Sequence, residues 1–212
     1  MMRWRDIDRM AAQVPLAAGY RFELLRREEI GLLIGALQAW YPDISVGAAS
    51  CFLRRDFFEE QVCFAGEPER DVIVFLMKRG DELAGMFSCD RDRDSLTLYA
   101  RLGVASPDHR GANLAEAGIA LTEQMGRRMG AGYLYGLATL KTRYVQRAFE
   151  RSGWQLVGIT PGFDRELVAP GVVKRVYEAV YSKVLVADAA LLHPQPQNLT
   201  PRTRSLFEGL FS

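Results

Sequence analysis

The sequence has little of what marks several classes of protein. It contains only 3 cysteines and 2 histidines among 212 residues, with no CxxC pair. We therefore expect reduced thiols at Cys51, Cys63 and Cys89, and neither a disulfide framework nor a metal site. No apolar run approaches the roughly 18 residues that a membrane-spanning helix needs. A basic excess is also lacking, because 27 Lys and Arg face 26 Asp and Glu. This balance argues against a dedicated nucleic-acid-binding protein.

The rest of the composition is typical of a soluble globular protein, with 49% hydrophobic and 25% charged residues. The first nine residues include acidic side chains and no apolar run, so we expect no secretory signal and a cytoplasmic protein. The length suits one domain with appendages. We expect an N-terminal amphipathic helix within 1–19, one domain over 20–185, and a Pro-containing linker with a C-terminal helix over 186–212.

Hydrophobic periodicity predicts strands and helices in the order β α α β β β α β α β β, which indicates an α/β fold with a mixed sheet. The expected elements are a strand at 20–25, helices at 28–40 and 46–62, strands at 71–78, 83–89 and 95–105, a helix at 112–128, a strand at 133–140, a helix at 142–152, and strands from 154 to 159 and over 172–185. We interpret the charged segments 90–94 and 162–166 as loops.

The segment from Ala105 to Ala115 is the most informative part of the sequence. It reads A-S-P-D-H-R-G-A-N-L-A and joins an expected strand to an expected long helix. Small residues that open a helix expose backbone N–H groups and the positive end of the helix dipole, which together favour an anion. Arg110 can add a charge-assisted contact. Neither the G-x-G-x-x-G nor the G-K-[ST] nucleotide-binding pattern is present.

This segment resembles the acyl-CoA loop of the GNAT superfamily of N-acetyltransferases, V-x-P-x-x-R-G-x-G-x-G/A. Pro107, Arg110, Gly111 and Ala115 match that pattern, whereas Ala105 replaces the usual Val. The residue at 113 is Asn where the family has its central Gly. Asn is the non-glycine residue that best tolerates positive φ, so we expect the loop geometry to survive.

The resemblance continues into the next helix, where A-F-E-R-S-G-W from 148 to 154 is similar to the family's A-x-x-L-Y-x-K-x-G-F. By this match Phe149 occupies the usual Tyr position and Thr142 the usual Asn position. The resemblance implies a GNAT-like mixed, mostly antiparallel central sheet flanked by helices. It also implies transfer of an acetyl group from acetyl-CoA to a primary amine on a small molecule or peptide, with no metal.

The coenzyme-binding residues follow from the same match. The pantetheine arm would lie along the end of a strand, and the pyrophosphate would sit on the loop amides. The residues so implied are Gly103, Val104, Ala105, Arg110, Gly111, Ala112, Asn113, Leu114, Ala115, Thr142 and Phe149.

The catalytic residues are harder to assign from the sequence. Phe149 has no hydroxyl that could protonate the leaving thiolate, so Tyr133 and Tyr135 on the neighbouring expected strand are the candidates for that role. The strand at 96–104 offers a tyrosine and an arginine but no carboxylate. Asp164 and Glu166 are the nearest acids by topology, and Glu166 is our candidate general base. We expect His109 to face solvent.

Two other functions remain open. A GNAT-like fold that has lost catalysis would serve as a binding or assembly module, an option that Thr142, Phe149 and Asn113 motivate. An acyltransferase could also use a longer-chain or carrier-protein donor, with the early helices lining an acyl tunnel. The amphipathic C-terminal helix needs a partner surface, either in its own subunit or in a homodimer. No sequence feature identifies the amine acceptor.

Overall fold

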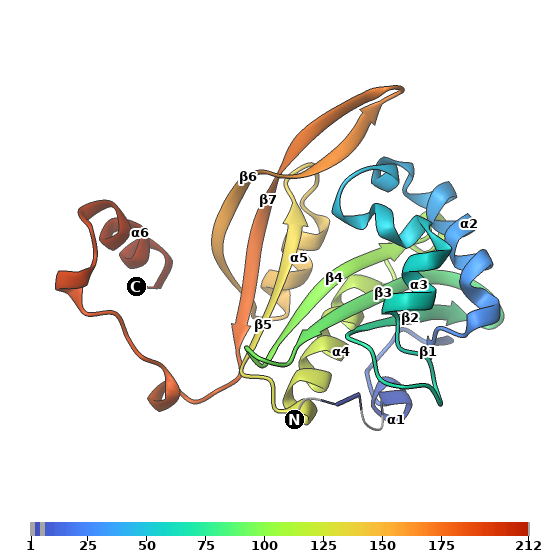
Figure 1. The fold of residues 1–212 in the computed structure, drawn as a ribbon, viewed down its shortest axis with the longest axis horizontal. Coiled ribbons are helices and arrows are strands. Elements are labelled where there is room, and N and C mark those ends of the chain that lie inside the picture. Colours follow the sequence, from blue (N-terminus) through green and yellow to red (C-terminus); the bar gives the residue numbers. More distant parts are fainter. Residues whose placement is uncertain (1–2, 5–6, 212) are drawn as a thin grey trace.

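The computed structural model describes residues 3–4 and 7–211. Seven strands form one sheet in the order β1-β2-β3-β4-β5-β7-β6 (Figure 1). The strands are β1 (Tyr20–Leu24), β2 (Val72–Arg79), β3 (Glu82–Asp92), β4 (Thr97–Ala105), β5 (Tyr133–Thr139), β6 (Gln155–Ala169) and β7 (Val172–Val184). Among the pairs that these strands form, only β4 with β5 is parallel. The predicted mixed, mostly antiparallel sheet and its element order are confirmed.

Helices cover both faces of this sheet (Figure 1). They are α1 (Ile7–Ala11), α2 (Ile30–Trp40), α3 (Arg55–Gln61), α4 (Leu114–Met129) and α5 (Tyr144–Arg151). A further helix, α6 (Pro201–Phe211), lies apart from the sheet. The buried residues form two clusters: one joins the sheet to α1, α4 and α5, and the other joins it to α2 and α3. The sheet is therefore the middle layer of three.

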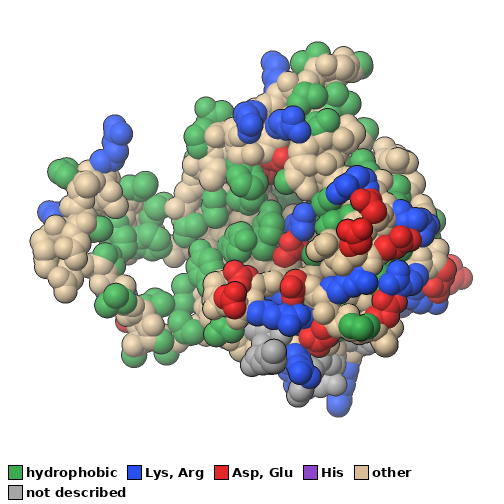
Figure 2. Space-filling view, in the orientation of Figure 1, with side chains coloured by type: hydrophobic (Ala, Val, Ile, Leu, Met, Phe, Trp, Pro, Cys, Tyr) green, Lys and Arg blue, Asp and Glu red, His purple; other side chains and the backbone are tan. Residues whose placement is uncertain are grey.

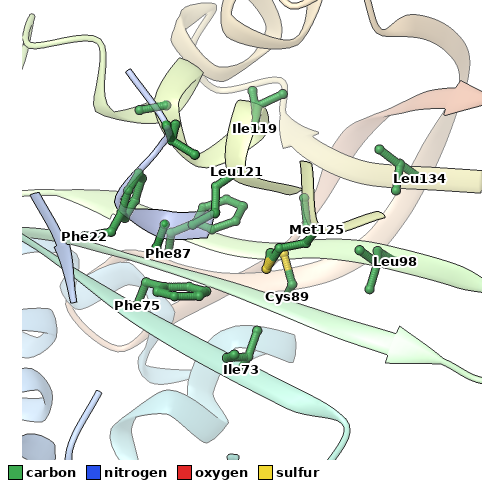
Figure 3. Packing of buried hydrophobic residues seen from close by; sticks show 14 of the residues in the cluster. Phe22, Ile73, Phe75, Phe87, Cys89, Leu98, Ile119, Leu121, Met125 and Leu134 are labelled. Carbon is green, nitrogen blue, oxygen red and sulfur yellow. The ribbon is translucent and has the colours of Figure 1, made fainter. Parts of the chain in front are cut away.

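The long helix α4 packs one apolar side on the sheet because its hydrophobic residues recur at helical spacing. Leu121 and Met125 are fully buried there, against Phe87 and Cys89 of β3 (Figure 3). Gly118 makes the approach of Phe87 feasible, since a Cβ at that position would lie 2.5 Å from the Phe87 ring. This packing fixes the start of α4, and so the loop before it, relative to the end of β4.

The parallel strands β4 and β5 separate part of the way along their length. Their pairing runs from Thr97 with Tyr133 to Ala100 with Gly136 and then ends. On its other side β4 carries one extra residue, because Ser88 and Cys89 of β3 pair with Leu102 and Ala100 and leave Arg101 between them. Such a bulge bends a strand. The edge of β4 that faces β5 is consequently unpaired beyond Ala100.

Three expected elements differ in the structure. The helix predicted over 46–62 is broken: a 3₁₀ segment, Ala48–Leu53, precedes α3. Gly47, at φ +87, approaches β6 so closely that a Cβ would lie 2.2 Å from the Arg165 carbonyl oxygen. The interpretation of 162–166 as a loop was wrong, because these residues belong to β6 and pair with β7. The charged segment 90–94 is likewise strand as far as Asp92.

The two ends of the chain behave differently. The N-terminal helix is shorter than the one expected within 1–19, and residues 1–2 and 5–6 of that prediction lie outside the described residues. Its predicted apolar side is confirmed, since Trp4, Ile7, Met10 and Val14 are buried. No helix of the described residues is long and apolar enough to cross a membrane.

The C-terminal segment extends away from the sheet and ends in α6 (Figure 1). The Gln155 side-chain amide donates a hydrogen bond to the Leu210 carbonyl oxygen (2.6 Å) and links this helix to the start of β6. Leu192 is fully exposed and Leu206 largely so. Figure 2 shows hydrophobic side chains both on this arm and on the part of the body beside it.

Candidate active site

A cavity of about 420 Å³ occupies the fork between β4 and β5. The unpaired end of β4, from Arg101 to Ala105, forms one wall, and the end of β5 forms another. Leu114 and Ile119 of α4 contribute apolar surface. The segment 41–49 and strand β6 line the cavity from the other side of the sheet. A pocket where two strands diverge is a common place for a ligand, because backbone groups at the open edge are unpaired.

The loop at the mouth of this cavity has the geometry expected of an anion site. Its start is anchored by the Ser106 amide, which donates to the Ala84 carbonyl oxygen (2.8 Å). Gly111 has φ +93, and Asn113 has φ 56 and ψ 32 in the left-handed region. The expectation that Asn113 adopts positive φ is confirmed. Its side chain makes no capping hydrogen bond, so the first amides of α4 remain available for another acceptor.

His109 does not face solvent, and that expectation was wrong. Its side chain is only 4% exposed. Nδ1 lies 2.9 Å from the Tyr20 hydroxyl, and Nε2 lies 3.1 Å from a Glu82 carboxylate oxygen. The hydrogen bond with Tyr20 ties the loop to β1, whereas Nε2 makes no hydrogen bond within the described residues. The local sequence could not indicate this burial, because Tyr20 and Glu82 are distant in the chain.

The predicted coenzyme-binding residues are largely brought together. Those that line the cavity are Gly103, Val104, Ala105, Leu114, Ala115 and Phe149. The four remaining loop positions, 110 to 113, connect the end of β4 to α4 at the cavity mouth. Thr142 lies apart from this group: it is exposed in the turn before α5, where its carbonyl oxygen accepts a hydrogen bond from the Gln146 side chain (2.7 Å).

Phe149 is a packing residue as well as a cavity residue. Its ring stacks on Tyr181 with centroids 5.1 Å apart and contacts Trp154 at 5.0 Å. Gly136 leaves room for it, since a Cβ there would lie 2.4 Å from the ring. The Tyr181 hydroxyl donates to Glu150 (2.9 Å). Burial and that carboxylate raise the pKa of Tyr181 to about 12. Tyr181 therefore directs its hydroxyl to Glu150 and does not line the cavity.

The two tyrosines predicted as proton donors lie in the paired part of β5. Tyr133 pairs with Thr97 and Tyr135 with Tyr99, and neither β5 tyrosine lines the cavity. The ring of Tyr135 stacks on Tyr99 at 4.7 Å. Tyr99 does line the cavity, and burial raises its pKa. Tyr99, one strand further in the sheet, is thus the member of this aromatic row that lines the cavity, and its raised pKa keeps its hydroxyl protonated.

Glu166, the predicted base, is held by two partners. Its side chain is buried, with one oxygen accepting from the Tyr41 hydroxyl (3.0 Å) and the other from the Lys141 ammonium. Lys141 also binds Asp43 (2.6 Å). Burial opposes the charge of Lys141, but hydrogen bonds to the two carboxylates outweigh it and raise the lysine pKa. Glu166 thus links the segment 41–44 to β6.

Two other cavity carboxylates also have partners. The Asp90 carboxylate pairs with Arg101 (2.7 Å). Burial raises the pKa of Asp90 despite this pair. Asp164 accepts hydrogen bonds from the backbone amides of Ala48 and Arg165, each at 2.7 Å. These acids hold the cavity wall together.

Glu178 of β7 is a cavity residue that the sequence analysis missed. It lies opposite Thr139 in the β5–β7 pairing. Burial, with the nearby charges of Asp164 and Glu166, raises the pKa of Glu178 to about 7. Its Oε2 atom is buried and has no hydrogen-bond partner among the described residues. The only sequence signal is one acid within the apolar alternation V-Y-E-A-V-Y of a strand.

A scan against protein-family models found no match, and a search of curated proteins found none either. Among solved structures, the ribosomal alpha-N-protein acetyltransferase RimL in complex with coenzyme A matches with a TM-score of 0.60 and 11% identity, covering 81% of this chain and 97% of that one. A mutant form of the spermidine/spermine N-acetyltransferase SpeG from Vibrio cholerae matches with a TM-score of 0.61 and 10% identity, covering 79% and 94%.

A third solved structure, the IAA acetyltransferase from Bacillus cereus, matches with a TM-score of 0.54 and 12% identity, covering 78% of this chain and 99% of that one. The chain therefore has the fold of the GNAT N-acetyltransferases, as the loop resemblance predicted. Within the described residues, no group of three or more His, Cys, Asp or Glu side chains is arranged to hold a metal ion.

Proposed function

We propose that the protein is an acyl-CoA-dependent N-acetyltransferase that moves an acetyl group from acetyl-CoA to a primary amine of a small molecule or peptide. The observation that carries this proposal is the unpaired edge of β4, which borders a cavity and leads directly into the loop with left-handed Asn113. An extended ligand can hydrogen-bond to such an edge as a further strand would. A phosphate can then reach the first amides of α4.

The fit to coenzyme A is chemical as well as geometric. Gly103, Val104 and Ala105 supply backbone groups for the amides of a pantetheine arm, and the Arg110 guanidinium can pair with a pyrophosphate. The near-zero net charge of the chain supplies no general positive field, so local amides and Arg110 must hold the phosphates. RimL, with the same fold, is solved with coenzyme A.

Catalysis in this proposal depends on positioning. The cavity would hold the thioester beside the acceptor nitrogen, which attacks the carbonyl carbon directly. Backbone N–H groups at the bulge of β4 are suited to stabilise the oxyanion that develops. Tyr99 supplies the protonated hydroxyl near the leaving thiolate that Phe149 lacks. Tyr133 and Tyr135 would then support Tyr99 by stacking.

Calorimetric titration with acetyl-CoA tests the binding part of the proposal. We expect micromolar affinity for the full chain and at least tenfold weaker binding for Ala115→Asp. The new carboxylate lies in the first turn of α4, where it suits the helix dipole but repels a phosphate. Ala115→Ser keeps the residue small and neutral and is the matched control. Absence of binding up to millimolar acetyl-CoA would refute the proposal.

Acetylation of a panel of n-butylamine, spermidine and an N-terminal peptide amine tests the activity. Binding without any acetyl transfer would favour the catalytically inactive binding or assembly module, which the buried, hydroxyl-free Phe149 motivates. A longer-chain acyl-CoA titrated in the same way distinguishes the donor, and tighter binding of that compound would favour the longer-chain alternative. The mass of the protein in solution tests the homodimer.

A further inference from the structure

Four carboxylates line the cavity, and three of them are already engaged. The side chains are Asp90, Asp164, Glu166 and Glu178. A permanently charged guanidinium compensates the first, two backbone amides hold the second, and a tyrosine and a lysine hold the two oxygens of the third. Each of these three carboxylates has at least one oxygen in such an interaction, although Oδ1 of Asp90 has no hydrogen-bond partner among the described residues. Glu178 has no such interaction through Oε2 in the described residues.

Glu178 also approaches the cavity from the appropriate side of the sheet. Side chains alternate between the two faces of a strand. On β5, Gly136 faces Phe149 of α5, so Thr139, an odd number of positions later, faces the opposite side. Glu178 pairs directly with Thr139 and shares its side. The coenzyme loop and α4 belong to the face of Phe149, which leaves the face of Glu178 to the acceptor.

We propose that Glu178 is the general base that removes the proton from the acceptor amine. This inference rests on the proposed acetyltransferase function. The acceptor enters as an ammonium ion, and the Glu178 carboxylate, directly or through one water, takes one proton to give the neutral amine. The nitrogen lone pair then forms the C–N bond, the C–S bond breaks, and the thiolate leaves with its electron pair. The thiolate takes a proton from the Tyr99 hydroxyl, which regains one as the nitrogen loses its second proton. The products are the amide and the free thiol, with one proton remaining on Glu178.

The surroundings of Glu178 suit this role. Asp164 and Glu166 on β6 repel its negative charge, while Tyr99 on β4 and Tyr41 before the 3₁₀ segment are uncharged neighbours. Three cations are close to these groups: Arg101 and Arg165 line the cavity, and Lys141 binds Glu166. The pKa of Glu178 is about 7, which is where a general base works best at neutral pH. The same acidic surroundings favour a positively charged acceptor.

The test is the pH dependence of kcat/KM for the best acceptor of the panel above. For the natural sequence we expect a rising limb with an apparent pKa near 7. Glu178→Gln should abolish that limb and lower kcat/KM by roughly 10²–10⁴-fold, while acetyl-CoA affinity stays within about twofold. Glu178→Asp should restore the limb at a reduced rate, which a purely structural role would not produce.

Asp90→Asn and Glu166→Gln are the matched carboxylate variants of the same cavity. Asp90→Asn should retain the limb near pH 7 even where it weakens acceptor binding. Glu166→Gln should also retain the limb but shift it to lower pH, because the Glu166 charge helps to raise the pKa of Glu178. Loss of the limb in either variant and its retention in Glu178→Gln would overturn the inference and leave the acetyltransferase function intact. Absence of acetyl-CoA binding and of transfer would overturn both. Identical pH profiles for Glu178→Gln and the natural sequence would also overturn the assignment of Glu178.

Discussion

Glu178→Gln should make the folded protein more stable above neutral pH while removing its activity. The folded-state pKa of Glu178 is about 7, against 4.5 for an unperturbed glutamate. Between those values the folded protein binds the proton more tightly than the unfolded chain does. The free energy of unfolding therefore falls as pH rises from about 4.5 through 7, and the loss is complete above pH 7. Glutamine carries no charge and escapes this loss.

The expected size follows from the shift. A change from 4.5 to about 7 corresponds to roughly 3 kcal/mol, at 1.36 kcal/mol per pKa unit. Glu178 is only partly buried, and solvent screening reduces the effect, so we expect a gain of about 1–2 kcal/mol for Glu178→Gln at pH 8.5. At pH 5 the glutamate is protonated in the folded state, and the two proteins should differ little.

Urea unfolding at pH 5, 6, 7 and 8.5 measures this difference. All other titratable groups are present in both proteins and cancel in the comparison. The slope of urea dependence should be unchanged, because the surface exposed on unfolding is the same. If the difference in unfolding free energy stays constant over this pH range, the reasoning about Glu178 is wrong. A gain in stability at an active site that costs activity is a known trade-off.

Substitutions at three further sites, two of them with a matched control, test other parts of the structure. Gly118→Ala would place a Cβ 2.5 Å from a buried phenylalanine ring, so it should cost about 1–3 kcal/mol of unfolding free energy. Its control is Gly35→Ala, where a Cβ would meet no atom within 4 Å, and that change should stabilise α2 by about 0.5–1 kcal/mol. Equal effects of the two changes in urea unfolding would contradict the packing. Asn113→Val should lower the free energy of unfolding by about 1–2 kcal/mol, because a β-branched residue is strained at φ 56. The same change should weaken acetyl-CoA binding in calorimetry, whereas Asn113→Gly should keep the affinity. Interactions with Lys78 and Arg26 outweigh burial and lower the pKa of Glu29 to about 2. The contribution of Glu29 to the free energy of unfolding is therefore complete above pH 4.5 and disappears as pH falls towards 2. Glu29→Gln should reduce the pH dependence of the free energy of unfolding in that range, and an unchanged dependence would refute the role of these ion pairs.

Much of the fold could be predicted because its signals are local. The nearly continuous apolar run of β2, the alternation in β7 and the helical spacing of α4 follow from which side chains must be buried. The left-handed conformation at Asn113 was predictable for the same reason, since it depends on the residue type and its place in a loop. Residues 162–166 were misassigned because a long two-stranded ribbon with charged side chains resembles a solvated loop in composition.

The cavity carboxylates could not be ranked from the sequence. Glu166 was the nearest acid by topology, yet its binding to Tyr41 and Lys141 depends on residues up to 125 positions away. His109 was expected to face solvent for the same reason, because its neighbours Tyr20 and Glu82 are distant in the chain. Arg101 is the extra residue of the bulge in β4, next to the point where the pairing of β4 with β5 ends. No local sequence pattern marks it.

The sequence by itself determined the order of elements, the small-residue loop before α4 and the resemblance to an acyl-CoA site, because each depends on neighbours in the chain. The tertiary structure decided which titratable groups face the cavity. Tyr99 replaces Tyr133 and Tyr135 at its wall, and Glu178 is the acid without a partner for Oε2 among the described residues. The physical reason is that burial and opposing charges set the state of a carboxylate, and both arise from residues that only folding brings together.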